Sequence, residues 1–170
     1  MVIKSWLAHA PPNRLGSSYE LLSTSNGLEI TLVFQDSRSY WGWQYLTPQF
    51  RHVYALIRHP SLWVLFEPSV DGVRALPLDC PGEIDMTIAL KAKNPEIVLL
   101  RMLVSNERPG MPSFKFIFLS CVSSIQYLLG IYWPLTVTPW GLYSRLVRDT
   151  PAHIRILDDG WKQQESRKGS

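Results

Sequence analysis

Short segments with the pattern of β-strands, each followed by turn residues, fill the middle of this sequence and limit the folds open to it. The segment 28–34 alternates apolar and polar residues and is rich in β-branched side chains, as strands are. The same criteria predict four further strands, at 50–57, 62–67, 73–76 and 96–104. Strands joined by short turns pair antiparallel, so a mostly antiparallel central sheet is expected.

Helices are predicted on either side of these strands. The first would place Ile84 and Ile88 on one side, as an amphipathic helix does. Thr138 followed by Pro139 is typical of an N-cap and first helical position. The predicted fold class is α+β, a central sheet flanked by helices. The helices are expected at 83–93, 120–129 and 139–148, within a domain at 28–150 between an N-terminal arm (1–27) and a polar C-terminal tail (151–170).

Composition and charge narrow the range of functions. A length of 170 residues and an apolar fraction of 46% suit one globular domain with its own core. The net charge of +3 is mild and the basic residues are scattered, so nucleic acid is not an expected partner. His52 and His59 would lie on opposite sides of a bend, and no other cluster has metal-ligand spacing, so neither a metal nor a cofactor is expected.

An uncharged stretch, 116–144, is long enough to span a bilayer. Ser, Gln, Gly, Pro and Thr residues interrupt it, and Thr138-Pro139 marks the start of a new helix. Two helices with a turn between them are therefore expected, and no membrane span.

The main functional lead is a pair of residues, His52 at the start of a predicted strand and Cys121 at the start of a predicted helix. A thiolate is a strong nucleophile when a helix N-terminus or a neighbouring imidazolium lowers its pKa. If the fold brings His52 to Cys121, the thiol is expected to be unusually acidic. The less specific alternatives are a partly buried structural histidine and a small core cysteine.

The turn between the second and third strands decides what faces His52. With a four-residue turn at 58–61, His52 falls opposite Glu67, at about 5 Å between Cβ atoms. A carboxylate there would fix the tautomer of the imidazole and raise its basicity. A three-residue turn would instead pair His52 with Pro68.

Other residues complete the expected site. The backbone N–H of Cys121 is a natural member of an oxyanion hole, and Gln35, at the end of the first strand, is a second candidate. Trp41 and Trp43 lie in an aromatic loop before the His52 strand. Large aromatic side chains beside Gly in a loop favour binding, so both are expected at the rim of a cleft or at a docking surface.

The order of these motifs resembles the circularly permuted papain-like superfamily, in which the His strand precedes the Cys helix. That group includes lecithin–retinol acyltransferase and relatives of bacterial cell-wall amidases. Several short motifs between residues 28 and 148 are similar to small proteins encoded by phages and prophages. They are Phe50-Arg51-His52, Trp63-Val64-Leu65-Phe66-Glu67-Pro68, Cys121-Val122, Leu129-Gly130-Ile131 and Thr138-Pro139-Trp140-Gly141-Leu142-Tyr143.

The resemblance implies a permuted papain-like domain with Cys121 as nucleophile, His52 as general base and acid, and Glu67 as the residue that orients His52. The expected residue in that third place is Asp, and Glu is one methylene longer. The implied function is a thiol-dependent hydrolase or acyltransferase acting on an amide or ester bond, such as a phage peptidoglycan or maturation peptidase.

The alternative is a virion structural protein that uses the same fold as an assembly module, because a fold does not fix a function. The expected partners are a peptide or peptidoglycan substrate, or other virion proteins. The first twelve residues lack the apolar core of a signal peptide. Together with the resemblance to phage proteins, this implies the host cytoplasm, the virion or both as the expected location.

Overall fold

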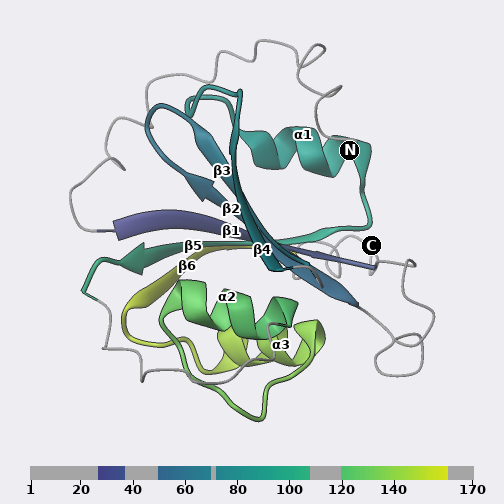
Figure 1. Ribbon diagram of the computed structural model, residues 1–170, viewed down its shortest axis with the longest axis vertical. Helices are drawn as coiled ribbons and strands as arrows, with labels where there is room; N and C mark the ends of the chain where they lie inside the picture. Colours follow the sequence, from purple (N-terminus) through teal and green to yellow (C-terminus); the bar gives the residue numbers. More distant parts are fainter. Residues whose placement is uncertain (1–26, 37–49, 70–71, 108–119, 161–170) are drawn as a thin grey trace, which may run out of the picture.

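The chain folds around one sheet of six strands, shown in the computed structural model of Figure 1. The structure describes residues 27–36, 50–69, 72–107 and 120–160. In spatial order the sheet reads β4-β3-β2-β1-β5-β6, and every neighbouring pair is antiparallel. Helix α1 lies on one face of the sheet, and α2 and α3 lie on the other (Figure 1). The elements are β1 (Gly27–Gln35), β2 (His52–Arg58), β3 (Trp63–Ser69), β4 (Gly72–Leu78), α1 (Met86–Lys93), β5 (Val98–Ser105), α2 (Cys121–Leu129), α3 (Pro139–Arg148) and β6 (Ile154–Asp159).

The predicted fold class, α+β with an antiparallel sheet and flanking helices, is confirmed. All five predicted strands and all three predicted helices are present, and their ends differ from the predicted ones by three residues or fewer. Periodicity and turn residues were enough here because most of these segments have an apolar side that is buried. Strand β4 is an exception, because its residues 73–77 are exposed.

The domain extends beyond the predicted boundary at residue 150. Strand β6 pairs with β5 and forms one edge of the sheet. Its first residue, Ile154, is buried, and the hydroxyl of Tyr143 on α3 donates to Asp159 at 2.7 Å. The predicted tail at 151–170 therefore begins inside the domain. The sequence pattern hid this strand because three of its six residues are charged and only Ile154 is buried.

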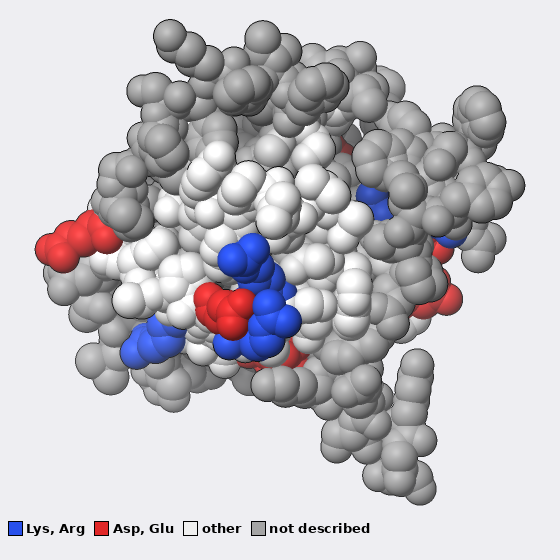
Figure 2. All heavy atoms as spheres, turned by 90° about the horizontal axis from the view of Figure 1, so that it is seen from below, with Lys and Arg blue, Asp and Glu red and all other residues white. Residues whose placement is uncertain are grey.

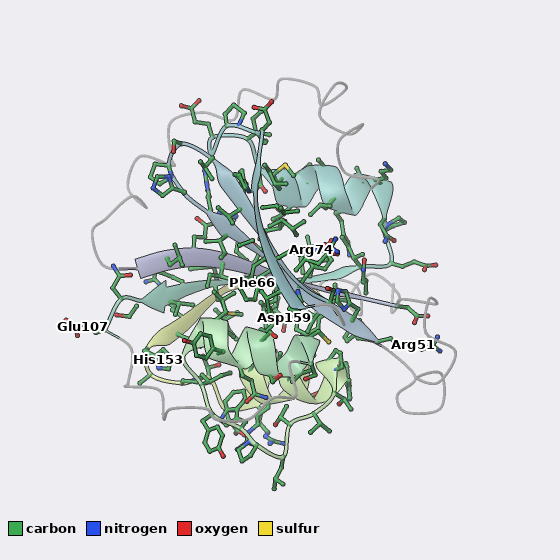
Figure 3. All side chains as sticks on the ribbon, in the orientation of Figure 1. Arg51, Phe66, Arg74, Glu107, His153 and Asp159 are labelled. Carbon is green, nitrogen blue, oxygen red and sulfur yellow. The ribbon has the colours of Figure 1, made fainter. Side chains whose placement is uncertain are left out.

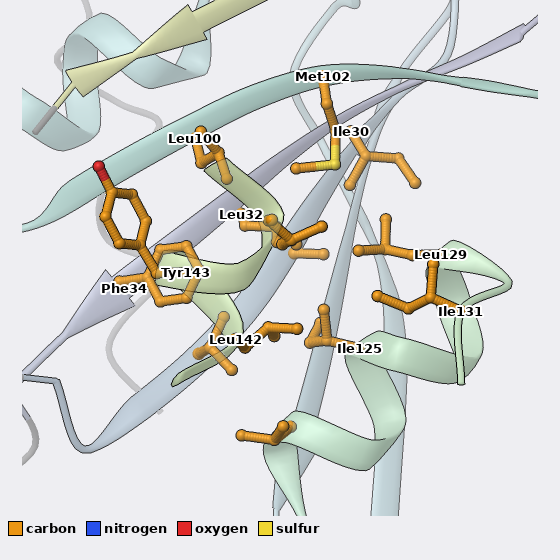
Figure 4. Packing of buried hydrophobic residues seen from close by; sticks show 14 of the residues in the cluster. Ile30, Leu32, Phe34, Leu100, Met102, Ile125, Leu129, Ile131, Leu142 and Tyr143 are labelled. Atoms are coloured by element: carbon orange, nitrogen blue, oxygen red, sulfur yellow. The ribbon is translucent and has the colours of Figure 1, made fainter. Parts of the chain in front are cut away.

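Two apolar layers lie on opposite faces of the sheet. Alternate residues of a strand point to opposite faces, so Ile30 and Phe34 of β1 face α2 and α3 while Val33 faces α1. Helices α2 and α3 add Ile125 and Leu142 to the larger layer (Figure 4). Burying one such side chain contributes about 1.5–3 kcal/mol, so this layer is the main apolar contribution to stability.

Helix α1 faces the sheet with a different side from the predicted one. Met86 and Leu90 pack against the sheet, whereas Ile84 and Ile88 are exposed. The cause is the N-cap, because the Asp85 side chain accepts a hydrogen bond from the backbone of Thr87 and starts the helix at Met86. The two pairs are offset by two residues, which puts them on nearly opposite sides of a helix.

A largely buried ion cluster fixes the start of α1 to the sheet. Glu29 on β1 pairs with Arg58 on β2 at 3.4 Å and with Arg101 on β5 at 2.5 Å. Arg101 also lies 3.8 Å from Asp85, the N-cap of α1. Because each charge has an opposite partner, removal of one would leave the others uncompensated in a poorly solvated place.

Candidate functional site

Cys121 is the first residue of α2, as predicted. The helix begins there because Ser120 and Ser123 cap each other, with O–N distances of 3.1 and 2.9 Å between side chain and backbone. It ends at Gly130, whose φ of 68° is in the left-handed region that favours glycine. The thiol is half-buried, packs against the apolar layer under α2 and α3, and is free of any disulfide.

The backbone N–H groups of Val53, Val122 and Cys121 itself lie near the Cys121 sulfur and lower the pKa of its thiol. Burial raises the pKa of the Cys121 thiol, and the three N–H groups only partly offset that rise. The prediction of an unusually acidic thiol is therefore wrong for the protein in this structure. Desolvation of the thiolate outweighs the donors at the helix start.

His52 is the first residue of β2 and is also half-buried. Strand alternation places its side chain on the α1 face together with Tyr54, and the two ring centroids are 6.1 Å apart. Its cross-strand partner on β1 is Gln35. Burial lowers the pKa of His52, and the negative charge of Glu67 opposes this effect. The imidazole is therefore mostly neutral at neutral pH.

The turn between β2 and β3 lies one residue later than predicted. His59 and Leu62 exchange backbone hydrogen bonds of 2.9 and 3.3 Å, which makes residues 60–61 the tip of the turn. The ladder behind it pairs Arg58 with Trp63. The register is therefore shifted by two residues from the predicted pairing.

This shift moves Glu67 away from the position predicted for it. The ladder ends at Ala55 opposite Phe66, and the same register carried on by one residue sets Glu67 beside Tyr54 instead of His52. A shift of two keeps the same face of the sheet, and the charge of Glu67 still acts on both rings. Burial raises the pKa of Tyr54 to about 12, and Glu67 contributes to that rise.

Tyr54 is therefore a member of this polar group that sequence reasoning missed. The sequence contained the signal for it, because Tyr54 lies two residues after His52, and residues two apart on a strand share a face. The described members of the group on the α1 face are Gln35, His52, Tyr54 and Glu67.

The structure brings Cys121 to the backbone of β2 but not to the imidazole of His52. The thiol packs on the α2 and α3 side of the sheet, beside the N–H of Val53, whereas His52 points to the α1 side. Among the described residues, no hydrogen bond joins His52 to Cys121 or to Glu67. Figure 3 shows this end of the sheet near the label of Arg51, the residue before β2.

Strands β2 and β3 separate at this same end. Their pairing stops at Ala55 opposite Phe66, while β3 continues to Ser69 paired with β4. Helix α2 contacts both strands. Cys121 therefore lies where the first residues of β2 have no β3 ladder beside them.

The remaining predicted residues are placed as follows. Gln35 shares the α1 face with His52, so it lies across the sheet from Cys121. The N–H of Cys121 lowers the pKa of its own thiol, and its role in an oxyanion hole stays a prediction. Trp41 and Trp43 lie outside the described residues. In the part of the chain that the structure describes, no three His, Cys, Asp or Glu residues are grouped to hold a metal ion.

A hollow of about 390 Å³ lies elsewhere, beside Cys80 and between the turn at Ser61 and the segment 77–81. None of the predicted site residues that the structure describes lines it. It is therefore not a substrate cleft for Cys121.

The largest exposures of apolar side chains in the described residues are in the loop between α2 and α3. There Leu135 is 91% exposed and Val137 65%, and Tyr127 near the end of α2 is 64% exposed. Figure 2 views the molecule from this side and shows a largely uncharged surface around one compact group of basic and acidic side chains. Within the described ranges, no helix is both long and apolar enough to cross a bilayer.

Comparison of the chain with protein-family models, with curated proteins and with solved structures found no match in any of the three.

Proposed function

We propose that the protein is a thiol-dependent hydrolase or acyltransferase with Cys121 as its nucleophile. The observation that carries the proposal is the place of the Cys121 thiol at the capped start of α2, where this helix packs on β2. The N–H groups of Val53, Cys121 and Val122 near the sulfur lower its pKa against the effect of burial. Donors in this arrangement can stabilise negative charge on the sulfur and, after attack, on the oxygen of a tetrahedral intermediate beside it.

In the proposed reaction the sulfur of Cys121 attacks the carbonyl carbon of an amide or ester. The thiol proton passes to the imidazole of His52, which then gives it to the leaving amine or alcohol as the C–N or C–O bond breaks. Water or another acceptor then resolves the thioester. The pKa of the thiol is raised and that of His52 is lowered. Both groups are therefore neutral at rest, which fits general-base activation at the moment of attack better than a preformed ion pair.

The separation of β2 and β3 is the feature that allows His52 to take part. His52 is the first residue of β2, and the β3 ladder begins only at Ala55. His52 is paired with Gln35 on the β1 side but has no ladder partner on the β3 side. In this proposal the imidazole reaches the thiol around that unpaired side of β2. In this proposal Glu67 and Tyr54 form the pocket in which the resting imidazole lies.

A permuted papain-like topology is part of the same proposal. The strand that carries His52 precedes the helix that carries Cys121, and that helix packs on this strand. A peptide or peptidoglycan amide bond is the substrate class that the sequence resemblance suggests.

The direct test is formation of an acyl adduct on the thiol. A Cys80→Ser chain treated with p-nitrophenyl acetate is expected to carry one acetyl group, located on Cys121 by peptide mass spectrometry. A Cys121→Ala chain provides the matched control and should stay unmodified at that position. If the Cys80→Ser chain carries no adduct on Cys121 and also releases p-nitrophenol no faster than the Cys121→Ala chain, the nucleophile assignment is wrong. Digestion of purified peptidoglycan by the same two chains then tests the substrate class.

A second candidate function, an assembly module in a virion, is favoured by the edge strand β4. Five consecutive residues of this strand, 73–77, are exposed, including the apolar Val73 and Leu76. An exposed edge strand can pair with a strand of another protein. Recovery of the chain at a fixed stoichiometry in purified particles, together with no adduct on Cys121, would favour this candidate.

A further inference from the structure

The loop between α2 and α3 holds apolar side chains out in solvent. Leu135 and Val137 are 91% and 65% exposed, and Tyr132 is 52% exposed. These three side chains and that of Tyr127, near the end of α2, are together called the apolar tip below. Isolated exposed apolar residues are common, but several on one short loop indicate a binding surface.

The loop is held in this shape by buried polar contacts. The side chain of Gln126 is buried, donates to the carbonyl of Thr136 and accepts from the N–H of Trp133, both at 2.9 Å. The guanidinium of Arg145 lies 4.8 Å from the ring centroid of Trp133. Because Gln126 satisfies backbone groups on both sides of Leu135, the loop is pre-organised and needs little ordering on binding.

We propose that the apolar tip docks on a lipid surface. Four exposed side chains are few compared with the roughly 20–30 residues that each partner contributes to a stable protein interface, but they suit shallow insertion at the headgroup boundary. Tyr, Trp and Leu are the residue types favoured there.

The surrounding charge agrees with a lipid partner. The sequence has no charged residue from 120 to 144, and Arg145 and Arg148 follow on α3. Asp149 pairs with both of them, so the net charge of these two arginines and one aspartate is positive. The apolar tip therefore has no acidic residue of its own to be repelled by headgroups, and anionic lipid should strengthen binding modestly.

The test is flotation of the full chain with vesicles of phosphatidylcholine alone and of phosphatidylcholine with phosphatidylglycerol. Binding to both is expected, and it should be tighter with phosphatidylglycerol. The variant Leu135→Ser with Val137→Ser should lose about tenfold or more in affinity, as expected from the transfer of one such side chain. The matched control, Ile84→Ser with Ile88→Ser, changes two exposed aliphatic residues on the α1 side and should float like the unchanged chain.

Several results would overturn the proposal. One is that the unchanged chain does not float with the vesicles. The others are that the Leu135→Ser, Val137→Ser variant floats as well as the unchanged chain, or that the control variant loses as much binding as this variant does. Light scattering gives a further check, because self-association that the loop substitutions abolish would make the apolar tip a protein interface. Circular dichroism should show both variants folded, since all four substituted side chains are exposed. The vesicle experiment is independent of the proposed thiol chemistry, because it measures binding and requires no reaction of Cys121.

Discussion

At the scale of single residues, burial sets the charge states of the two groups that matter most for chemistry. Burial raises the pKa of Cys121 and lowers that of His52. Both shifts favour the neutral form, as desolvation does for any ionisable group. Local sequence signals were enough to place Cys121 at a helix start, but they did not reveal how strongly the surrounding core would desolvate the thiol.

Alkylation of Cys121 is the direct measure of its pKa. In a Cys80→Ser chain, the rate of reaction with iodoacetamide should keep rising through pH 8, because the thiolate is the reactive form and burial raises the pKa. A rate that levels off below pH 7 would show a preformed thiolate and contradict the neutral resting state.

Glu67 and His52 should be coupled through their charges. The carboxylate of Glu67 raises the pKa of His52 against the effect of burial. Glu67→Gln removes that charge, so the pKa of His52 should fall further below 6.5. Titration of the His52 ring protons by NMR, in the unchanged chain and in Glu67→Gln, measures this shift. An unchanged His52 titration in Glu67→Gln would mean that the two groups do not interact.

The pairing register of β2 and β3, which sets the distance between Glu67 and His52, was predicted wrongly from the sequence. A turn one residue later at His59–Leu62 moved Glu67 from His52 to Tyr54. Turn residues identified the hairpin, but the position of the turn depends on which residues form the closing hydrogen bonds, and composition alone does not fix that.

At the scale of elements, caps decide where helices begin and therefore which side chains they present. Ser120 caps α2 and sets Cys121 as its first residue, while Asp85 caps α1 and turns Met86 towards the sheet. The first helix was predicted with the wrong side inwards because Ile84 and Ile88 have the same spacing as Met86 and Leu90.

Loss of the α2 cap should both destabilise the protein and expose the thiol. Ser120→Ala removes the acceptor for the Ser123 N–H, which should lower the free energy of unfolding by about 1 kcal/mol. It should also speed alkylation of Cys121, because fraying of the first turn exposes a half-buried group. Thr138→Ala is the matched control, since it removes the equivalent cap of α3 and should cost similar stability without changing Cys121. Equal alkylation rates in the two variants would show that the exposure of Cys121 does not depend on the cap of α2.

At the scale of the whole molecule, the sheet is completed by its last strand. Strand β6 pairs with β5, and its first residue, Ile154, is buried. Its last residue, Asp159, accepts a hydrogen bond from the hydroxyl of Tyr143. Truncation after residue 150 should therefore lower the free energy of unfolding by several kcal/mol, about the sum of one lost apolar core contact, one buried hydrogen bond and an uncovered edge. Thermal unfolding followed by circular dichroism measures this. A truncated chain with the unfolding midpoint of the full chain would show that β6 adds little.

The central claim is that Cys121 is a nucleophile served by His52 at the end of the sheet where β2 and β3 separate. The most direct measurement is the rate of acetylation of Cys121 by p-nitrophenyl acetate in a Cys80→Ser chain, with and without His52→Asn. Loss of a general base should slow the reaction by about a hundredfold or more. Equal rates in the two chains would show that the imidazole stays on its own face of the sheet and that the claim is wrong.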